Sequence, residues 1–180
     1  LDAESLAYAG LKALAAVERA SRELAAAARA VPPRSLEVFS FTLETPRGLI
    51  VLRGTGPDRN VATRPGRVLL AVDLGGNDRW TGPFAAASWP SQPVSVAIDL
   101  GGNDVWDGGS GPSAGAGLGG VGILWDASGD DRYEAGARSQ GFAQLGVGIL
   151  ADLGGNDAYR LGTGGQGAAA FGAALLFDRS

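Results

Sequence analysis

The sequence contains no cysteine, no histidine and no methionine. Without cysteine, the chain has no disulfide framework, no thiolate nucleophile and no cysteine-type metal site, so its redox compartment stays open. Without histidine, it cannot assemble a Ser-His-Asp triad, a Cys-His dyad or an imidazole metal site from its own residues. These absences exclude the most common hydrolase designs.

Clustered positive charge and long apolar runs are also missing. The 180 residues carry a formal net charge of −4, and binding a phosphate backbone needs clustered cations, so we expect no nucleic acid partner. No run of 18 apolar residues occurs, so we expect no membrane span. With 45% hydrophobic and 19% charged residues, the composition is ordinary for a folded globular domain.

Glycine is scarce in the first quarter of the chain and abundant afterwards. Gly10 stands alone before residue 48, and the other 29 glycines lie from Gly48 onward. Residues 1–34 space their apolar side chains by three and four, which predicts an amphipathic helix that ends at Pro32-Pro33. We interpret it as a capping or linker helix, with a partner-binding helix as the alternative.

The remaining residues divide into two further regions. Residues 35–60 predict a pair of strands, at 36–44 and 49–52, followed by a degenerate first coil. Residues 61–180 hold a regular repeat, in which AVDLGGNDRW at 71–80 returns as AIDLGGNDVW at 97–106. The last copy stops in the middle of this motif, so we expect further repeats of the same chain beyond Ser180.

Three positions of the motif recur in register. The first aspartates follow one another at intervals of 26, 27, 26 and 26 residues, at Asp73, Asp99, Asp126, Asp152 and Asp178. A second aspartate follows five residues later in four copies, at Asp78, Asp104, Asp131 and Asp157. An aromatic residue follows two residues after that, at Trp80, Trp106, Tyr133 and Tyr159. In an earlier, degenerate copy these three positions are taken by Arg53, Asp58 and Asn60.

A period of this length and regularity is typical of a solenoid. Helical repeats are disfavoured because the units contain glycine-rich corners such as GLGGVG, and a propeller blade needs about 40 residues. The sequence therefore predicts a mainly β fold: a parallel β-solenoid of about five coils of about 26 residues, with an N-terminal α-helix. Equivalent residues would stack as ladders at about 4.8 Å.

Stacked aspartates present an electrostatic problem. Two unit charges about 4.8 Å apart repel by roughly 3.5 kcal/mol at an effective dielectric constant of 20, or about 1 kcal/mol in water. Asx-turns could satisfy each aspartate locally, because its side chain would accept backbone N–H groups two or three residues on. Alternatively, Ca²⁺ could bind, since it takes six to eight oxygen ligands. Arg79, Arg132 and Arg160 follow the acidic positions and could also neutralise them.

For the calcium hypothesis the candidate ligands are the aspartates of the two ladders. They are Asp73, Asp78, Asp99, Asp104, Asp126, Asp131, Asp152 and Asp157.

The corner motif Gly76-Asn77-Asp78-Arg79-Trp80 resembles the G-x-D-x-hydrophobe core of the RTX-type calcium-binding repeats. The whole unit is similar to uncharacterised bacterial D-x-x-G-[ND]-D-x-[YW] β-solenoid repeat proteins, a similarity that implies no activity. The RTX resemblance implies Ca²⁺ bound between successive turns and an extracellular or cell-surface location in a bacterium.

Two functions from different classes follow. The first is a non-catalytic structural or interaction module with calcium at its acidic corners, acting on an unknown protein or glycan surface. The alternative is a polysaccharide-binding or polysaccharide-cleaving parallel β-helix domain, in which Asp78 and Asp104 would act as acid and base. Catalytic groups are usually singular, whereas these residues recur in every coil. The orientation of Trp80 and Trp106 discriminates, because a sugar platform requires exposed aromatic faces.

Overall fold

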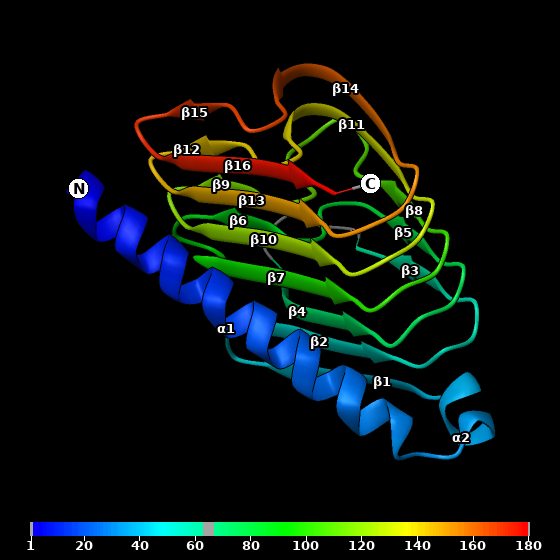
Figure 1. Cartoon of the computed structure of the whole chain (residues 1–180). Helices are drawn as coiled ribbons and strands as arrows, with labels where there is room; N and C mark the ends of the chain where they lie inside the picture. The colour runs from blue at the N-terminus through cyan, green and yellow to red at the C-terminus, as the bar shows by residue number, and fades with distance from the viewer. Residues whose placement is uncertain (1, 63–66, 180) are drawn as a thin grey trace.

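The computed structural model describes residues 2–62 and 67–179. Leu1, residues 63–66 and Ser180, which fall within the predicted regions, lie outside the described residues. The described chain consists of an N-terminal helix and a parallel β-solenoid with four complete three-stranded coils and a partial coil at each end (Figure 1). The predicted mainly β fold, N-terminal helix and coil length of about 26 residues are confirmed, with four complete coils in place of about five.

The N-terminal region differs from the prediction in one detail. Helix α1 (Ala3–Arg29) begins where the side chain of Asp2 accepts the backbone N–H groups of Glu4 and Ser5. A second short helix, α2 (Pro33–Glu37), then occupies residues that we expected to begin a strand. Proline at the first turn favours a helix because its fixed φ suits that position, and the first strand therefore starts only at Ser40.

Three sheets form the faces of the solenoid. The seven-stranded sheet contains, in spatial order, β1 (Ser40–Thr45), β2 (Gly48–Arg53), β4 (Val68–Asp73), β7 (Val94–Asp99), β10 (Val121–Asp126), β13 (Val147–Asp152) and β16 (Ala173–Asp178). The five-stranded sheet contains β3 (Arg59–Val61), β5 (Arg79–Thr81), β8 (Val105–Asp107), β11 (Arg132–Ser139) and β14 (Ala158–Gly165). The four-stranded sheet contains β6 (Ala86–Ser88), β9 (Ala116–Leu118), β12 (Ala143–Gln144) and β15 (Ala169–Ala170).

The pairing of the strands confirms the repeat register. All pairs between coils are parallel, and only β1 runs antiparallel, against β2, as the predicted strand pair. Asp126 lies opposite Asp99 and Asp152 in the seven-stranded sheet. In the five-stranded sheet Trp80 lies opposite Trp106. One motif per coil therefore stacks directly on the next.

Strands of the seven-stranded sheet are apolar on both faces because both faces are covered. Side chains alternate along a strand, so Leu124 packs inside the solenoid while Ile123 and Trp125 face outward toward α1. The same alternation turns Asp126 inward, and this side chain is fully buried. The first ladder is thus inside the molecule.

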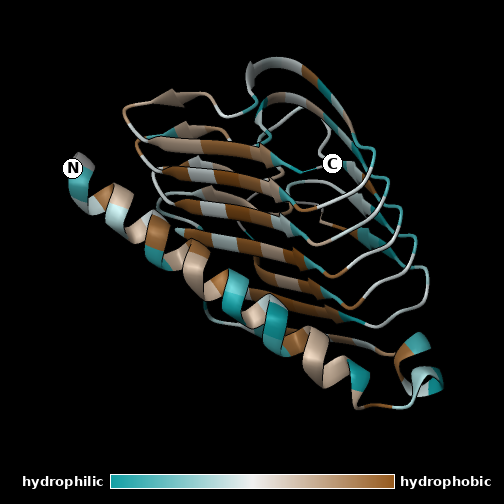
Figure 2. Ribbon diagram, viewed as in Figure 1, coloured by the Kyte–Doolittle hydropathy of each residue, from teal (hydrophilic) through white to brown (hydrophobic). Residues whose placement is uncertain are grey.

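Helix α1 lies diagonally across the outer face of the seven-stranded sheet (Figure 1). The strands that the helix crosses are largely brown, that is apolar, in Figure 2, and Val17 of the helix packs in one cluster with Ile123 and Ile149. Trp125 donates its indole N–H to Ser21 of the helix over 3.1 Å. None of the described helices combines the length and the apolarity that crossing a bilayer requires.

Candidate metal sites

Three aspartates of the first ladder, Asp73, Asp99 and Asp152, form Asx-turns, as one of the two hypotheses predicts. Asp73 Oδ1 accepts the backbone N–H of Gly75 at 3.0 Å, and Asp99 Oδ1 accepts that of Gly101 at 2.9 Å. The glycines at this corner have positive φ angles, 128° at Gly75, which L-residues with a side chain rarely adopt. Each of these aspartates therefore has one oxygen satisfied within its own coil.

The second aspartate ladder uses a bond that crosses between coils. Asp104 Oδ1 accepts the backbone N–H of Asp78, in the preceding coil, at 2.7 Å. Asp131 Oδ1 accepts the N–H of Asp104 at 2.6 Å, and Asp157 Oδ1 that of Asp131 at 2.8 Å. The local Asx-turn hypothesis does not describe this ladder, because these carboxylates fasten one coil to its neighbour.

The two ladders converge at the corner between the seven-stranded and the five-stranded sheet. Within residues 2–62 and 67–179 the carboxylates form four groups of three, in each of which one oxygen per residue lies within 4.8 Å of the others. Each group combines the two aspartates of one coil with the second aspartate of the preceding coil. The groups are Asp58, Asp73 and Asp78; Asp78, Asp99 and Asp104; Asp104, Asp126 and Asp131; and Asp131, Asp152 and Asp157.

All eight aspartates proposed from the sequence are members of these groups, and Asp58 is a ninth that we did not include. The alignment of the degenerate copy contained the signal, because Asp58 holds the second-aspartate position there. Asp178 continues the first ladder opposite Asp152 but belongs to none of the four groups.

One oxygen of most of these carboxylates has no hydrogen-bond partner among the described residues although it is buried. These atoms are Oδ2 of Asp73, Asp78, Asp99, Asp104, Asp131 and Asp157, and Oδ1 of Asp126. Exposure of the first five residues and of Asp126 is 3% or less. A buried carboxylate oxygen without a partner is costly, so the corner requires a cation or protons.

The environment makes the charged forms unfavourable. Burial, strengthened by neighbouring carboxylates, raises the pKa of Asp73 and Asp131 to about 8 and that of Asp78 to about 6. For the same reasons the pKa of Asp99 and Asp126 lies well above the ordinary value. Without added positive charge, the folded protein retains protons that an exposed aspartate loses near pH 4.

Aromatic side chains supply donors that the sequence analysis did not identify. Tyr133 Oη lies 3.0 Å from Asp126 Oδ2 and 2.8 Å from Asp152 Oδ2, so the hydroxyl links two coils. Tyr159 donates to the same Asp152 oxygen at 3.2 Å, and the indole N–H of Trp106 donates to Asp126 Oδ2 at 3.3 Å. Three of the four aromatics at this position therefore bond to ladder carboxylates, whereas the buried Trp80 indole N–H has no partner among the described residues.

The arginines that could have neutralised the ladders pair elsewhere. Arg79 bonds to Asp107 at 2.7 Å, and both Arg132 and Arg160 pair with Glu134. No ion pair between an arginine and a ladder carboxylate occurs in residues 2–62 and 67–179. Arginine neutralisation is therefore not supported.

The aromatic column is internal. Trp80 and Trp106 stack at 4.9 Å between ring centroids, and Tyr133 and Tyr159 do the same. Exposure is 1% for Trp80, 4% for Trp106 and 0% for Tyr133. These faces cannot serve as a platform for sugar rings, and the column packs the interior and holds the coils in register.

Comparisons with known protein families, with curated proteins and with solved structures found no match for this chain. Function is therefore inferred from the geometry of the corner.

Proposed function

We propose that the protein is a non-catalytic structural or interaction module, a β-solenoid whose acidic corners bind Ca²⁺ between successive coils. The observation that carries this proposal is the convergence of buried carboxylates whose second oxygens have no partner in the described residues. A cation at each group would satisfy these oxygens and would offset the repulsion along both ladders.

The donor atoms favour calcium over other metals. Carboxylate oxygens are hard ligands, and the chain has no histidine or cysteine to select zinc or copper. Magnesium requires near-ideal octahedral geometry and usually retains several waters, whereas calcium accepts irregular shells of protein oxygens. Most of the aspartates at this corner are buried. Calcium–oxygen distances of about 2.3–2.6 Å also suit carboxylate oxygens that lie within 4.8 Å of one another.

The number of charges is consistent with this proposal. The four groups contain nine different aspartates, because neighbouring groups share their second aspartates. Four divalent ions carry eight positive charges, so full occupancy would leave the corner with one negative charge. Removal of the ions would leave the column with either strong repulsion or bound protons.

The proposal includes an extracellular or cell-surface location in a bacterium, which the resemblance to RTX-type repeats supports. Extracellular calcium modules bind their ion at about 10⁻⁴–10⁻³ M, so the corners would fill outside the cell. Calcium would then act as a structural ligand that rigidifies the solenoid, and the outer faces would contact a protein or glycan surface.

Thermal unfolding followed by circular dichroism tests the proposal. The midpoint should be lowest in excess EGTA and should rise as Ca²⁺ is added, because Ca²⁺ at a hundredfold excess over Kd stabilises the folded protein by about 2.7 kcal/mol per site. The same concentration of Mg²⁺ should give a much smaller rise. An unchanged midpoint, together with no metal in elemental analysis of the purified protein, would overturn the proposal.

A further inference from the structure

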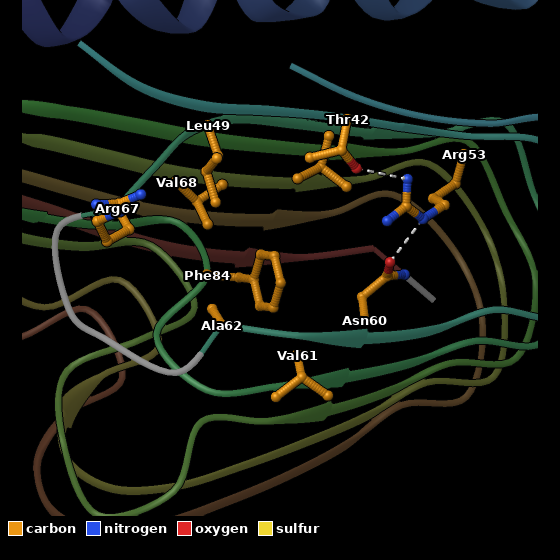
Figure 3. A pocket seen from close by; sticks show the side chains of 10 residues that line it. Thr42, Leu49, Arg53, Asn60, Val61, Ala62, Arg67, Val68 and Phe84 are labelled. Carbon is orange, nitrogen blue, oxygen red and sulfur yellow. Dashed lines mark hydrogen bonds between the residues drawn. The ribbon is translucent and has the colours of Figure 1, made fainter. Parts of the chain in front are cut away.

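A pocket of about 450 Å³ opens at the N-terminal end of the solenoid, apart from the acidic groups. Figure 3 shows its lining, which comes from β1, β2, β3 and β4 and from Ala62, Arg67 and Phe84. Phe84 and Val68 are buried at its base, whereas Val61 at its rim is 65% exposed. The volume lies within the range of about 300–1,000 Å³ that is typical of small-molecule sites.

The pocket exists because the first coil departs from the repeat. Asn60 lies opposite Trp80 in the five-stranded sheet, so an amide occupies the position that an aromatic ring fills in the next coils. Leu52 lies opposite Val72, which places Arg53 in line with the first aspartate ladder. The degenerate coil thus has a smaller side chain in the interior and a positive charge where the other coils have a negative one.

The Arg53 guanidinium is held in place by the protein. Its Nε donates to Asn60 Oδ1 at 2.8 Å. Its Nη1 donates to the carbonyl oxygens of Leu52 and Phe41 and to Thr42 Oγ1, at 2.9, 3.1 and 3.3 Å. Its Nη2 has no hydrogen bond to the described residues, and in Figure 3 the remaining nitrogen points into the space between Arg53 and Phe84. Nη2 is therefore the guanidinium nitrogen that can donate to a ligand, and the other hydrogen bonds already orient it.

The charge in the pocket matches a single negative group. Arg53 has no ion pair in the described part of the chain, whereas Arg67, also in the lining, pairs with Glu44. A dianion would bring one charge without a partner into the pocket, which is unfavourable. A carboxylate can accept a charge-assisted hydrogen bond from Nη2, and its single charge leaves no excess.

Apolar side chains form part of the lining between the two arginines. They are Leu49, Val51, Val68 and Phe84, and the Phe84 ring is fixed edge-on against Trp80 at 4.8 Å. An aliphatic or aromatic body would bury its surface here, and such burial contributes about 25 cal/mol per Å².

We propose that this pocket binds a small organic carboxylate, with the carboxylate on Arg53 and an apolar body against Phe84 and Val68. The site is independent of the calcium groups, since none of their aspartates lines it. A calcium-binding module would thereby hold one small acid at its N-terminal end.

Isothermal titration calorimetry with 3-phenylpropionate tests this proposal, and the neutral 3-phenylpropan-1-ol is the matched ligand. The acid should bind saturably, and the alcohol at least about tenfold more weakly, which corresponds to about 1.4 kcal/mol. The variant Arg53→Gln should lose at least as much affinity for the acid. Arg47→Gln, in the exposed turn between β1 and β2, is the control and should bind as the wild type does.

A second variant covers the case in which Arg53→Gln fails to fold, which circular dichroism will reveal. Val61→Asp places a negative charge on the exposed rim without a change in the interior, and it should weaken binding of the acid but not of the alcohol. Equal affinity for acid and alcohol, no saturable binding at millimolar acid, or tighter binding of inorganic phosphate to the same site would each overturn the assignment.

Discussion

The substitution Asp99→Asn should change stability in opposite directions without and with calcium. Asp99 is fully buried and lies between Asp73 and Asp126 in the first ladder. Asparagine keeps the Oδ1 acceptor for the Gly101 N–H but removes the charge. In the metal-free protein this removes repulsion, whereas in the calcium-loaded protein it removes a ligand.

The size of both effects follows from the ladder. Each neighbour about 4.8 Å away contributes roughly 1 to 3.5 kcal/mol of repulsion between ionised groups, for effective dielectric constants of 80 and 20. We use the lower value for each of the two neighbours, because bound protons already relieve part of this repulsion. The metal-free variant should then gain about 2 kcal/mol of stability at pH 8, which corresponds to a rise of about 4 to 8 °C in the unfolding midpoint. Loss of one calcium site should reduce the calcium-induced rise by about 2.7 kcal/mol at a hundredfold excess over Kd.

Asp130→Asn is the matched control. Asp130 is exposed, and it stands in a ladder in which the other coils have Asn77, Asn103 and Asn156. Its Oδ1 accepts the backbone N–H of Asn156 at 2.9 Å, a bond that asparagine can also make. The control makes the same chemical change outside the four groups and should move stability by less than about 0.5 kcal/mol.

Differential scanning calorimetry at pH 8, in EGTA and in Ca²⁺ at a hundredfold excess over Kd, measures these effects. The reasoning would be refuted if Asp99→Asn lowered the midpoint in EGTA as much as in calcium and left the calcium-induced rise unchanged. That result would mean that Asp99 is an uncharged packing residue rather than a ligand.

Three further predictions concern pH, the corner glycines and the hydroxyl between coils. The folded-state pKa of Asp73 and Asp131 is raised to about 8. The metal-free protein should therefore lose about 1.4 kcal/mol of stability per pH unit for each such group as pH rises from about 4 to 8. Urea unfolding in EGTA measures this loss, and stability that rises over this pH range would contradict the prediction. Gly102→Ala should destabilise the protein by about 2 kcal/mol or more, because φ of Gly102 is 139° and the new Cβ would lie 1.4 Å from a backbone oxygen of the preceding coil. Gly111→Ala is the control and should not destabilise it, because the space around Gly111 is open. Similar urea midpoints for the two variants would argue against this packing. Tyr133→Phe should cost about 1 to 3 kcal/mol, since its hydroxyl bonds to two ladder carboxylates, and an unchanged midpoint in guanidinium would show that these bonds contribute nothing.

The register of the fold was predictable, because identical spacing forces identical residues into the same position of every coil. Asp99 lies opposite Asp126 for the same reason that the motif repeats. The alternation of side chains would also have placed these aspartates inside the solenoid, since Leu124 and Asp126 are two residues apart on one strand.

The contacts between coils were not predictable from spacing alone. The bond from the Asp78 N–H to Asp104 Oδ1 depends on backbone orientation at a corner, which two glycines leave undetermined. The short helix α2 was missed because Leu36 and Glu37 fit a strand pattern as well as a helix. The pocket beside Arg53 depends on the volume that Asn60 leaves in the interior, and a pattern of residue types contains no information on volume.

The number of calcium ions bound per chain tests the central claim most directly. Equilibrium dialysis against calcium, followed by elemental analysis, should find about four ions in the wild type, one for each carboxylate group. Asp104 belongs to two groups and Asp99 to one, so Asp104→Asn should lose two ions and Asp99→Asn one. No bound calcium in the wild type, or the same number in all three proteins, would contradict the account.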